Sequence, residues 1–148
     1  MKIKLQAINM VETSAALGLG DDPKYSMVLQ SQIEYYNKVG FNPPWIGYLA
    51  LSHSNVVGVC SFKGSPTKDK VEIGYFTFPE HERNGYGTLM CAGLVEIALA
   101  TDPKVIVTAR TLPQHNPSTA ILNKNGFVRQ GTVLDDEDGE VWEWVFVK

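Results

Sequence analysis

The most informative stretch of the chain is Glu72-Ile73-Gly74-Tyr75-Phe76-Thr77-Phe78-Pro79-Glu80-His81-Glu82-Arg83-Asn84-Gly85-Tyr86-Gly87-Thr88. Its apolar first half predicts a strand over 71–78, and the largely apolar segment 85–100 predicts a helix. A strand that turns into a helix through glycines presents backbone N–H groups at the helix start, where the helix dipole favours a phosphate or pyrophosphate. A second interpretation stays open, because Gly-x-Gly at this place also allows a helix to pack closely against a sheet.

The rest of the chain predicts short elements on both sides of this stretch. We expect further strands over 3–8, 46–51, 56–62, 105–109, 127–134 and 141–147, and helical segments within 26–39 and over 117–125. The runs 46–51, 56–62 and 71–78 form an antiparallel meander. The strand, helix and strand that follow form a βαβ unit, whose two strands are parallel by the right-handed crossover rule. The predicted fold class is therefore α+β with one mixed sheet, and a ligand would bind at the carboxyl ends of the parallel strands.

Composition sets limits on function. The 148 residues, 44% of them hydrophobic, suit a single domain over 1–148, and the formal net charge of −3 offers no broad basic surface for nucleic acid. No run is apolar for long enough to cross a membrane, so we expect a soluble, cytoplasmic protein. Cys60 and Cys91 lack metal-ligand spacing and are interpreted as buried small apolar residues, with no metal expected. The acidic turn 135–138 is interpreted as a solvated hairpin tip.

Two nucleotide-binding motifs are excluded by the residues themselves. A P-loop needs Gly-Lys-Ser/Thr, whereas Gly87 is followed directly by Thr88. A dinucleotide fingerprint needs a third small residue where Met90 stands, and it follows the first strand of a parallel sheet rather than a meander.

The glycine loop and a second motif resemble one known family. The run Glu82-Arg83-Asn84-Gly85-Tyr86-Gly87-Thr88 resembles the Gln/Arg-x-x-Gly-x-Gly/Ala pyrophosphate loop of the GNAT superfamily of acyl-CoA-dependent N-acetyltransferases. Residues 111–127 are similar to that family's second motif, an Asn and a small polar residue before a short helix and Gly-Phe. Pro44-Trp45 and residues 140–144 are similar to small bacterial members near the ribosomal-protein N-terminal acetyltransferases. The resemblance covers the chain from about residue 44 onward, and the first third matches only in outline.

The resemblance implies a splayed pair of parallel strands, a closing hairpin and acetyl-CoA as co-substrate. It places the pantetheine arm along Phe76, Thr77 and Phe78, with Asn116 at its end. The pyrophosphate would take backbone N–H groups from Arg83, Asn84, Gly85, Tyr86, Gly87 and Thr88. Glu82 departs from the family pattern, and we expect its side chain to turn to solvent because a carboxylate repels phosphate.

The resemblance also implies candidates for proton transfer. An acceptor amine with a pKa near about 10 is protonated at neutral pH and must lose a proton to become a nucleophile. Glu72 matches the position of the family's general base; the alternative role is an ion pair with a lysine such as Lys70. Many members have a Tyr that serves as general acid and protonates the departing thiolate, and Leu122 stands at that position here. Ser118 stands where the ribosomal-protein branch has a serine. Ser118 is otherwise a hydrogen-bonding residue of the first helical turn.

We therefore expect an N-acetyltransferase that moves acetyl directly to a primary amine. The acceptor is a small-molecule amine or a protein N-terminus, and a homodimer is left open. The alternative is a non-catalytic acyl-CoA-binding sensor or carrier, motivated by Glu82 and Leu122. In this fold the acceptor side is built largely from residues 17–45, where the resemblance is weakest.

Overall fold

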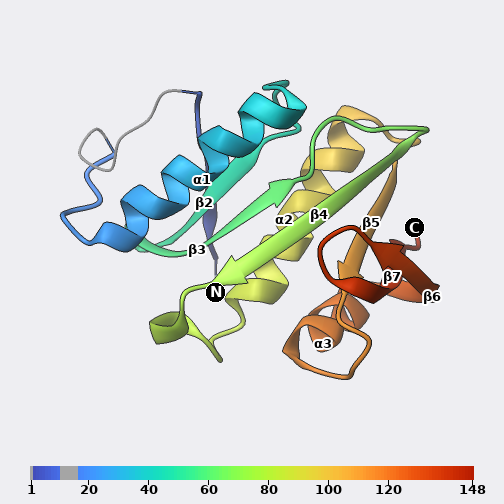
Figure 1. The fold of residues 1–148 in the computed structure, drawn as a ribbon. Coiled ribbons are helices and arrows are strands. Elements are labelled where there is room, and N and C mark those ends of the chain that lie inside the picture. The colour runs from blue at the N-terminus through green and yellow to red at the C-terminus, as the bar shows by residue number, and fades with distance from the viewer. Residues whose placement is uncertain (1, 11–16) are drawn as a thin grey trace.

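The computed structural model describes residues 2–10 and 17–148. A seven-stranded mixed sheet runs in the order β1-β2-β3-β4-β5-β7-β6 and carries helices on its two faces (Figure 1). The elements are β1 (Lys4–Ala7), α1 (Pro23–Val39), β2 (Gly47–Ser52), β3 (Asn55–Phe62), β4 (Lys70–Thr77), η1 (Pro79–His81), α2 (Tyr86–Thr101), β5 (Ile106–Thr111), α3 (Pro117–Lys124), β6 (Phe127–Asp135) and β7 (Gly139–Phe146). The predicted α+β fold is confirmed.

Most element boundaries lie within two residues of the prediction, and the larger differences have local causes. Helix α1 begins three residues before Ser26, because the Asp22 side chain accepts a hydrogen bond from the Lys24 N–H and Pro23 occupies the first turn. Strand β5 continues through Arg110 and Thr111, which pair with β7. The 3-10 turn η1 was not predicted.

The parallel pair β4 and β5 separates part-way along its length. Parallel pairing joins Lys70–Ile73 to residues 106–109 and then stops. Beyond that point β4 continues to Thr77 alongside β3 only, while β5 pairs with β7. Figure 1 shows the two strands starting together and diverging toward η1 and α3. The splayed pair that the family resemblance implied is present.

The two long helices cover opposite faces of the sheet (Figure 1). Helix α2 packs on β3 and β4 through apolar residues that are buried or nearly so, among them Met90, Cys91 and Leu94. A side chain at Gly58 of β3 would lie 3.0 Å from the Met90 Cε, so glycine allows this close approach. Along β4, Val71 and Ile73 are buried, whereas Glu72 and Gly74 are half-buried on the other face. The side chains available for chemistry therefore point to the face that α1 covers.

Both cysteines lie in the core, Cys60 at 2% and Cys91 at 0% exposure, as expected for small apolar residues. Burial raises the pKa of the Cys91 thiol to about 12. Within residues 2–10 and 17–148, no group of His, Cys, Asp and Glu side chains is arranged to hold a metal ion. None of the helices in the same ranges is both long and apolar enough to span a membrane.

Candidate active site

The start of α2 forms an open cluster of backbone donors. Gly85 caps the helix in the left-handed conformation with φ 80°, and Arg83 before it has φ 65°. The first turn ends where the Leu89 N–H donates to the Gly85 carbonyl at 3.2 Å. The N–H groups of Tyr86, Gly87 and Thr88 have no acceptor among the described residues. They are free to bind an anion at the positive end of the helix dipole.

The loop before α2 is held in shape by its own side chain. Asn84 Nδ2 donates to the carbonyls of His81 at 3.1 Å and Glu82 at 3.2 Å, which draws residues 81–84 into a tight curl. Glu82 is exposed, in agreement with the expectation that its side chain turns to solvent. The curl therefore leaves the helix start accessible.

The two glycines of the loop have different roles. A side chain built at Gly85 meets nothing within 4 Å, so the space above the helix start is open. A side chain at Gly87 would lie 2.5 Å from the Ile121 Cδ1 of α3, and Gly87 is buried. Gly87 thus has a packing role, but it allows the helix α3 to approach α2, whereas the sequence interpretation had been close packing of α2 on the sheet. Gly85 shapes the open helix start.

The free edge of β4 leads from the strand opening to this helix start. Phe76 is 52% exposed, whereas Phe78 is 3% exposed and contacts the Phe76 and Tyr25 rings edge-to-face, each at 5.9 Å. In the part of the chain that the structure describes, no strand pairs with the β5-facing edge of β4 beyond Ile73. An extended ligand could lie along this edge as a sheet partner would.

The second motif begins α3 with a full capping box. Asn116 Oδ1 accepts from the Thr119 N–H at 3.1 Å, and Thr119 Oγ1 accepts from the Asn116 N–H at 3.0 Å. The Asn116 carboxamide oxygen is therefore occupied, which leaves its NH₂ for a ligand. The Ser118 carbonyl accepts from the Tyr75 hydroxyl at 3.1 Å, a contact that links β4 to α3. Leu122 is fully buried.

Asn116 and Ser118 line a hollow of about 250 Å³ beside the strand opening. Its other walls come from the end of β3, from β5 and from the β6–β7 hairpin: Lys63, Arg110, Thr111, Leu112, Asp135, Asp138 and Val141. The structure thus brings the second motif to a site that also holds two cations and two carboxylates.

Glu72 belongs to an ion-pair cluster around this hollow. Its Oε2 lies 2.7 Å from Lys63 Nζ, and its Oε1 lies 3.7 Å from Arg110 Nε. The alternative role, an ion pair with a lysine at a strand end, is confirmed, but the partner is Lys63 and not Lys70. The β3–β4 register brings Lys63 across the sheet to Glu72, where the Lys63 N–H also donates to the Glu72 carbonyl at 2.8 Å. The predicted base is therefore held between two cations.

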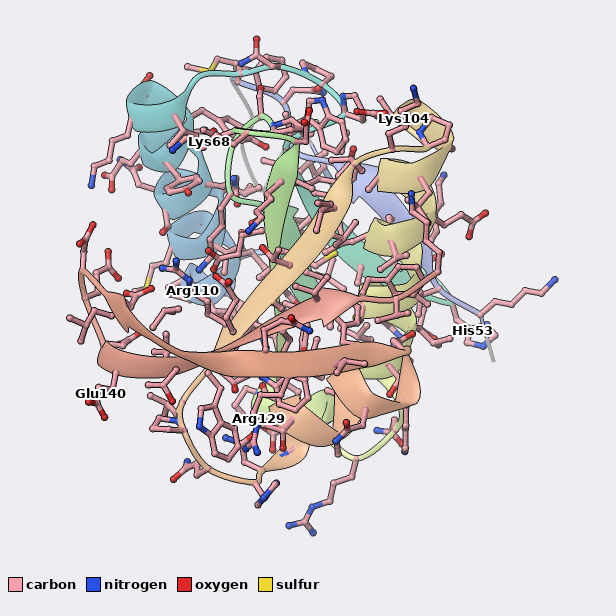
Figure 2. The ribbon with its side chains drawn as sticks, turned by 90° about the vertical axis from the view of Figure 1, so that its right-hand side faces the viewer. His53, Lys68, Lys104, Arg110, Arg129 and Glu140 are labelled. Atoms are coloured by element: carbon pink, nitrogen blue, oxygen red, sulfur yellow. The ribbon has the colours of Figure 1, made fainter. Side chains whose placement is uncertain are left out.

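Arg110 of β5 lies on the side of the sheet where α1 packs (Figure 2), and its guanidinium links β5 to three other strands. Besides Glu72 on β4, its guanidinium reaches Asp135 of β6 at 3.2 Å and Glu143 of β7 at 3.5 Å. The N–H groups of Glu137 and Asp138, together with Arg110, lower the pKa of Asp135 below its ordinary value. The acidic turn was predicted to be a solvated tip, but its first carboxylate is tied to β5. The sequence missed Lys63 and Arg110 because only the strand register brings them to Glu72.

Comparison with known proteins gives the family. Residues 23–128 match the family described as acetyltransferase (GNAT) domain. The chain belongs to this GNAT family. It is 30% identical over 93 residues to the uncharacterized N-acetyltransferase YjdG of Bacillus subtilis, a match that covers 62% of this chain and 52% of the relative. The chain thus spans about half the length of the curated relative that it matches.

Solved structures share the GNAT fold over almost the whole chain. RimL, a ribosomal L7/L12 alpha-N-protein acetyltransferase in complex with coenzyme A, has a TM-score of 0.70 at 17% identity and covers 99% of this chain and 94% of its own. A chimera of the spermidine N-acetyltransferase SpeG from Vibrio cholerae has a TM-score of 0.71 at 14% identity, covering 99% and 96%. PseH of Campylobacter jejuni, in complex with acetyl coenzyme A, has a TM-score of 0.68 at 16% identity, covering 99% of both chains.

Proposed function

We propose that this GNAT protein transfers acetyl from acetyl-CoA directly to a primary amine. One observation carries the proposal: the free edge of β4 beyond Ile73 leads to the unpaired N–H groups of Tyr86, Gly87 and Thr88. The edge can pair with the amides of the pantetheine arm, and the helix start can bind the pyrophosphate without a basic surface. Acetyl-CoA supplies an activated acyl group whose thiolate is a good leaving group.

The proposed reaction needs positioning and proton transfer. The opening between β4 and β5 would hold the thioester and the amine next to each other, so that the two react as groups of one complex and need not meet by diffusion. The amine nitrogen attacks the thioester carbonyl, the C–S bond breaks, and the amine proton passes to Glu72 directly or through water. Ser118 lines the same hollow and is the proposed proton donor to the departing sulfur. Asn116 keeps its NH₂ available for the pantetheine end.

The acceptor is proposed to be a small-molecule amine or a protein N-terminus. The structural neighbours include a ribosomal-protein N-terminal acetyltransferase, a spermidine acetyltransferase and an aminoglycoside-bound AAC(6′)-Ib. An acceptor would enter the hollow that Lys63, Asn116 and Ser118 line beside the β6–β7 hairpin, next to the ion pair of Glu72.

The test is release of free thiol from acetyl-CoA in the presence of an amine panel that contains a peptide N-terminus, lysine, a polyamine and an aminoglycoside. At least one amine is expected to accelerate release, and Glu72→Gln is expected to lose about a hundredfold of that rate while calorimetry shows unchanged acetyl-CoA binding. Binding without thiol release across the panel would instead favour the non-catalytic acyl-CoA-binding module. The observation that favours this non-catalytic alternative is the buried Leu122, which stands where the family usually has a Tyr that serves as general acid.

A further inference from the structure

The contact between Lys63 and Glu72 already resembles an acceptor amine on its base. We propose that the protein acetylates its own Lys63 side chain, with acetyl-CoA as donor. The inference rests on the proposed function, since it uses the same donor site and the same base. It adds a modification site on the chain itself.

The position of Lys63 supports this role. Its Nζ lies 2.7 Å from Glu72 Oε2, and its side chain is 46% exposed. Its Cε lies 3.7 Å from the place where a Gly74 side chain would begin. Gly74 directly follows Ile73, the last β4 residue that pairs with β5. The lysine therefore crosses β4 where the strand opening begins, and it lines the same hollow as Asn116 and Ser118.

The surroundings of Lys63 control its protonation. Glu72 of β4, Tyr35 of α1 and Asp135 of β6 all act on its charge, and Arg110 of β5 lies on the far side of Glu72. Burial alone lowers the pKa of Lys63, but the hydrogen bond and charge of Glu72 outweigh it and raise the pKa above the ordinary value. Loss of a proton to Glu72 is therefore required before attack, and we expect a slow reaction that occurs once per chain.

The step balances as an ordinary acyl transfer. One ammonium proton passes to Glu72 and then to water, and the freed nitrogen attacks the thioester carbonyl. The new C–N bond forms as the C–S bond breaks, and the second nitrogen proton goes to the departing thiolate to give the free thiol of CoA. The acetylated side chain is neutral and no longer forms an ion pair with Glu72.

Two other lysines serve as internal controls for unassisted acetylation. Lys68 and Lys104 are exposed, and Figure 2 places both near the top of the view, above Arg110. Neither forms an ion pair with a carboxylate among the described residues. Spontaneous reaction with acetyl-CoA would modify them at least as readily as Lys63, because their amines are not held by a base.

The experiment incubates the purified full chain with acetyl-CoA and no added amine. Intact-mass spectrometry is expected to show the gain of one acetyl group, and peptide mapping is expected to place it on Lys63. The first-order rate constant is expected to stay unchanged on tenfold dilution of the protein, since the reaction occurs within one chain. Glu72→Gln is expected to slow it about a hundredfold, Lys63→Arg to abolish it, and Lys68→Arg to leave it unchanged.

Acetylation of Lys68 and Lys104 as fast as Lys63, or an unchanged rate in Glu72→Gln, would overturn the inference. Acetyl-CoA binding is measured on the same samples by calorimetry. Binding with an unmodified Lys63 overturns the inference and leaves the proposed function standing, whereas absence of binding overturns both.

Discussion

At the scale of single residues, Arg110 is the centre of the charge cluster beside the strand opening. It reaches carboxylates on β4, β6 and β7, and its side chain is 31% exposed. Because exposed ion pairs contribute little to stability, its main effect is to hold Glu72 and the hairpin in fixed positions. The charges of the site are thus organised by one guanidinium.

Replacing Arg110 with Met tests this organisation through the titration of Asp135. In the wild type the Asp135 carboxyl is expected to titrate below the ordinary aspartate pKa of about 4. In Arg110→Met its pKa should rise only part of the way, because the N–H groups of Glu137 and Asp138 still donate to it. Carboxyl-detected NMR titration measures both values, and identical values in the two proteins would contradict the assigned contact.

The lowered pKa of Asp135 determines how this carboxyl changes the stability of the fold with pH. A carboxyl whose pKa is lower in the folded state stabilises the fold at pH values above its unfolded pKa. That contribution is lost as the pH falls through the folded value. Acid therefore removes the stabilisation that the Asp135 carboxylate contributes to the β6–β7 hairpin. In Arg110→Met this loss of stability should be smaller and should occur at higher pH.

Glu82 is the residue where this chain departs from its family's loop. It is exposed and close in sequence to the open helix start, so its negative charge would repel a bound phosphate. Because its side chain points to solvent, its replacement should remove no favourable contact with the ligand. We predict that Glu82→Gln binds acetyl-CoA equally well or more tightly in calorimetry. Glu96→Gln on the exposed side of α2 removes the same charge farther along the helix and serves as the control. A large loss of affinity in Glu82→Gln alone would reveal a contact by the carboxylate.

At the scale of elements, the start of α2 depends on the left-handed conformation of Gly85. A branched residue there is strained by about 1–2 kcal/mol and stands beside the unpaired N–H groups. We predict that Gly85→Val lowers both the melting temperature and the acetyl-CoA affinity. Gly20 also has a positive φ, 83°, with nothing within 4 Å of a built side chain. Gly20→Val should therefore share the strain and keep the affinity, and equal affinity losses in the two variants would remove the loop from the site.

The sequence predicted those elements whose causes are local. Helix α3 could be predicted because Asn116, Pro117 and Gly126 cap and terminate it within one short stretch of sequence. The glycine loop could be predicted for the same reason. The packing role of Gly87 could not, because it depends on where α3 lies in the fold. An ion pair of Glu72 with a lysine was among the predictions, but its partners Lys63 and Arg110 were not identified, because they reach Glu72 only through strand register, which residue patterns do not fix.

At the scale of the whole molecule, the splayed sheet separates two tasks. Under the proposed function, the free edge of β4 and the start of α2 would form the donor side, while Glu72 and the hollow would form the acceptor side. Both sides meet near Gly74, where the pairing of β4 and β5 ends. Acetyl-CoA is therefore expected to bind in this opening and to stabilise the folded chain.

Thermal unfolding with and without acetyl-CoA tests this expectation most directly. A ligand at about 100 times its dissociation constant stabilises the native state by about 2.7 kcal/mol, which corresponds to several degrees in a domain of this size. We predict such a rise with acetyl-CoA, most of it retained with CoA, and little with adenosine, because the helix start binds phosphate rather than base. NAD should leave the transition unmoved. A transition that NAD or ATP shifts while millimolar acetyl-CoA does not would contradict the account.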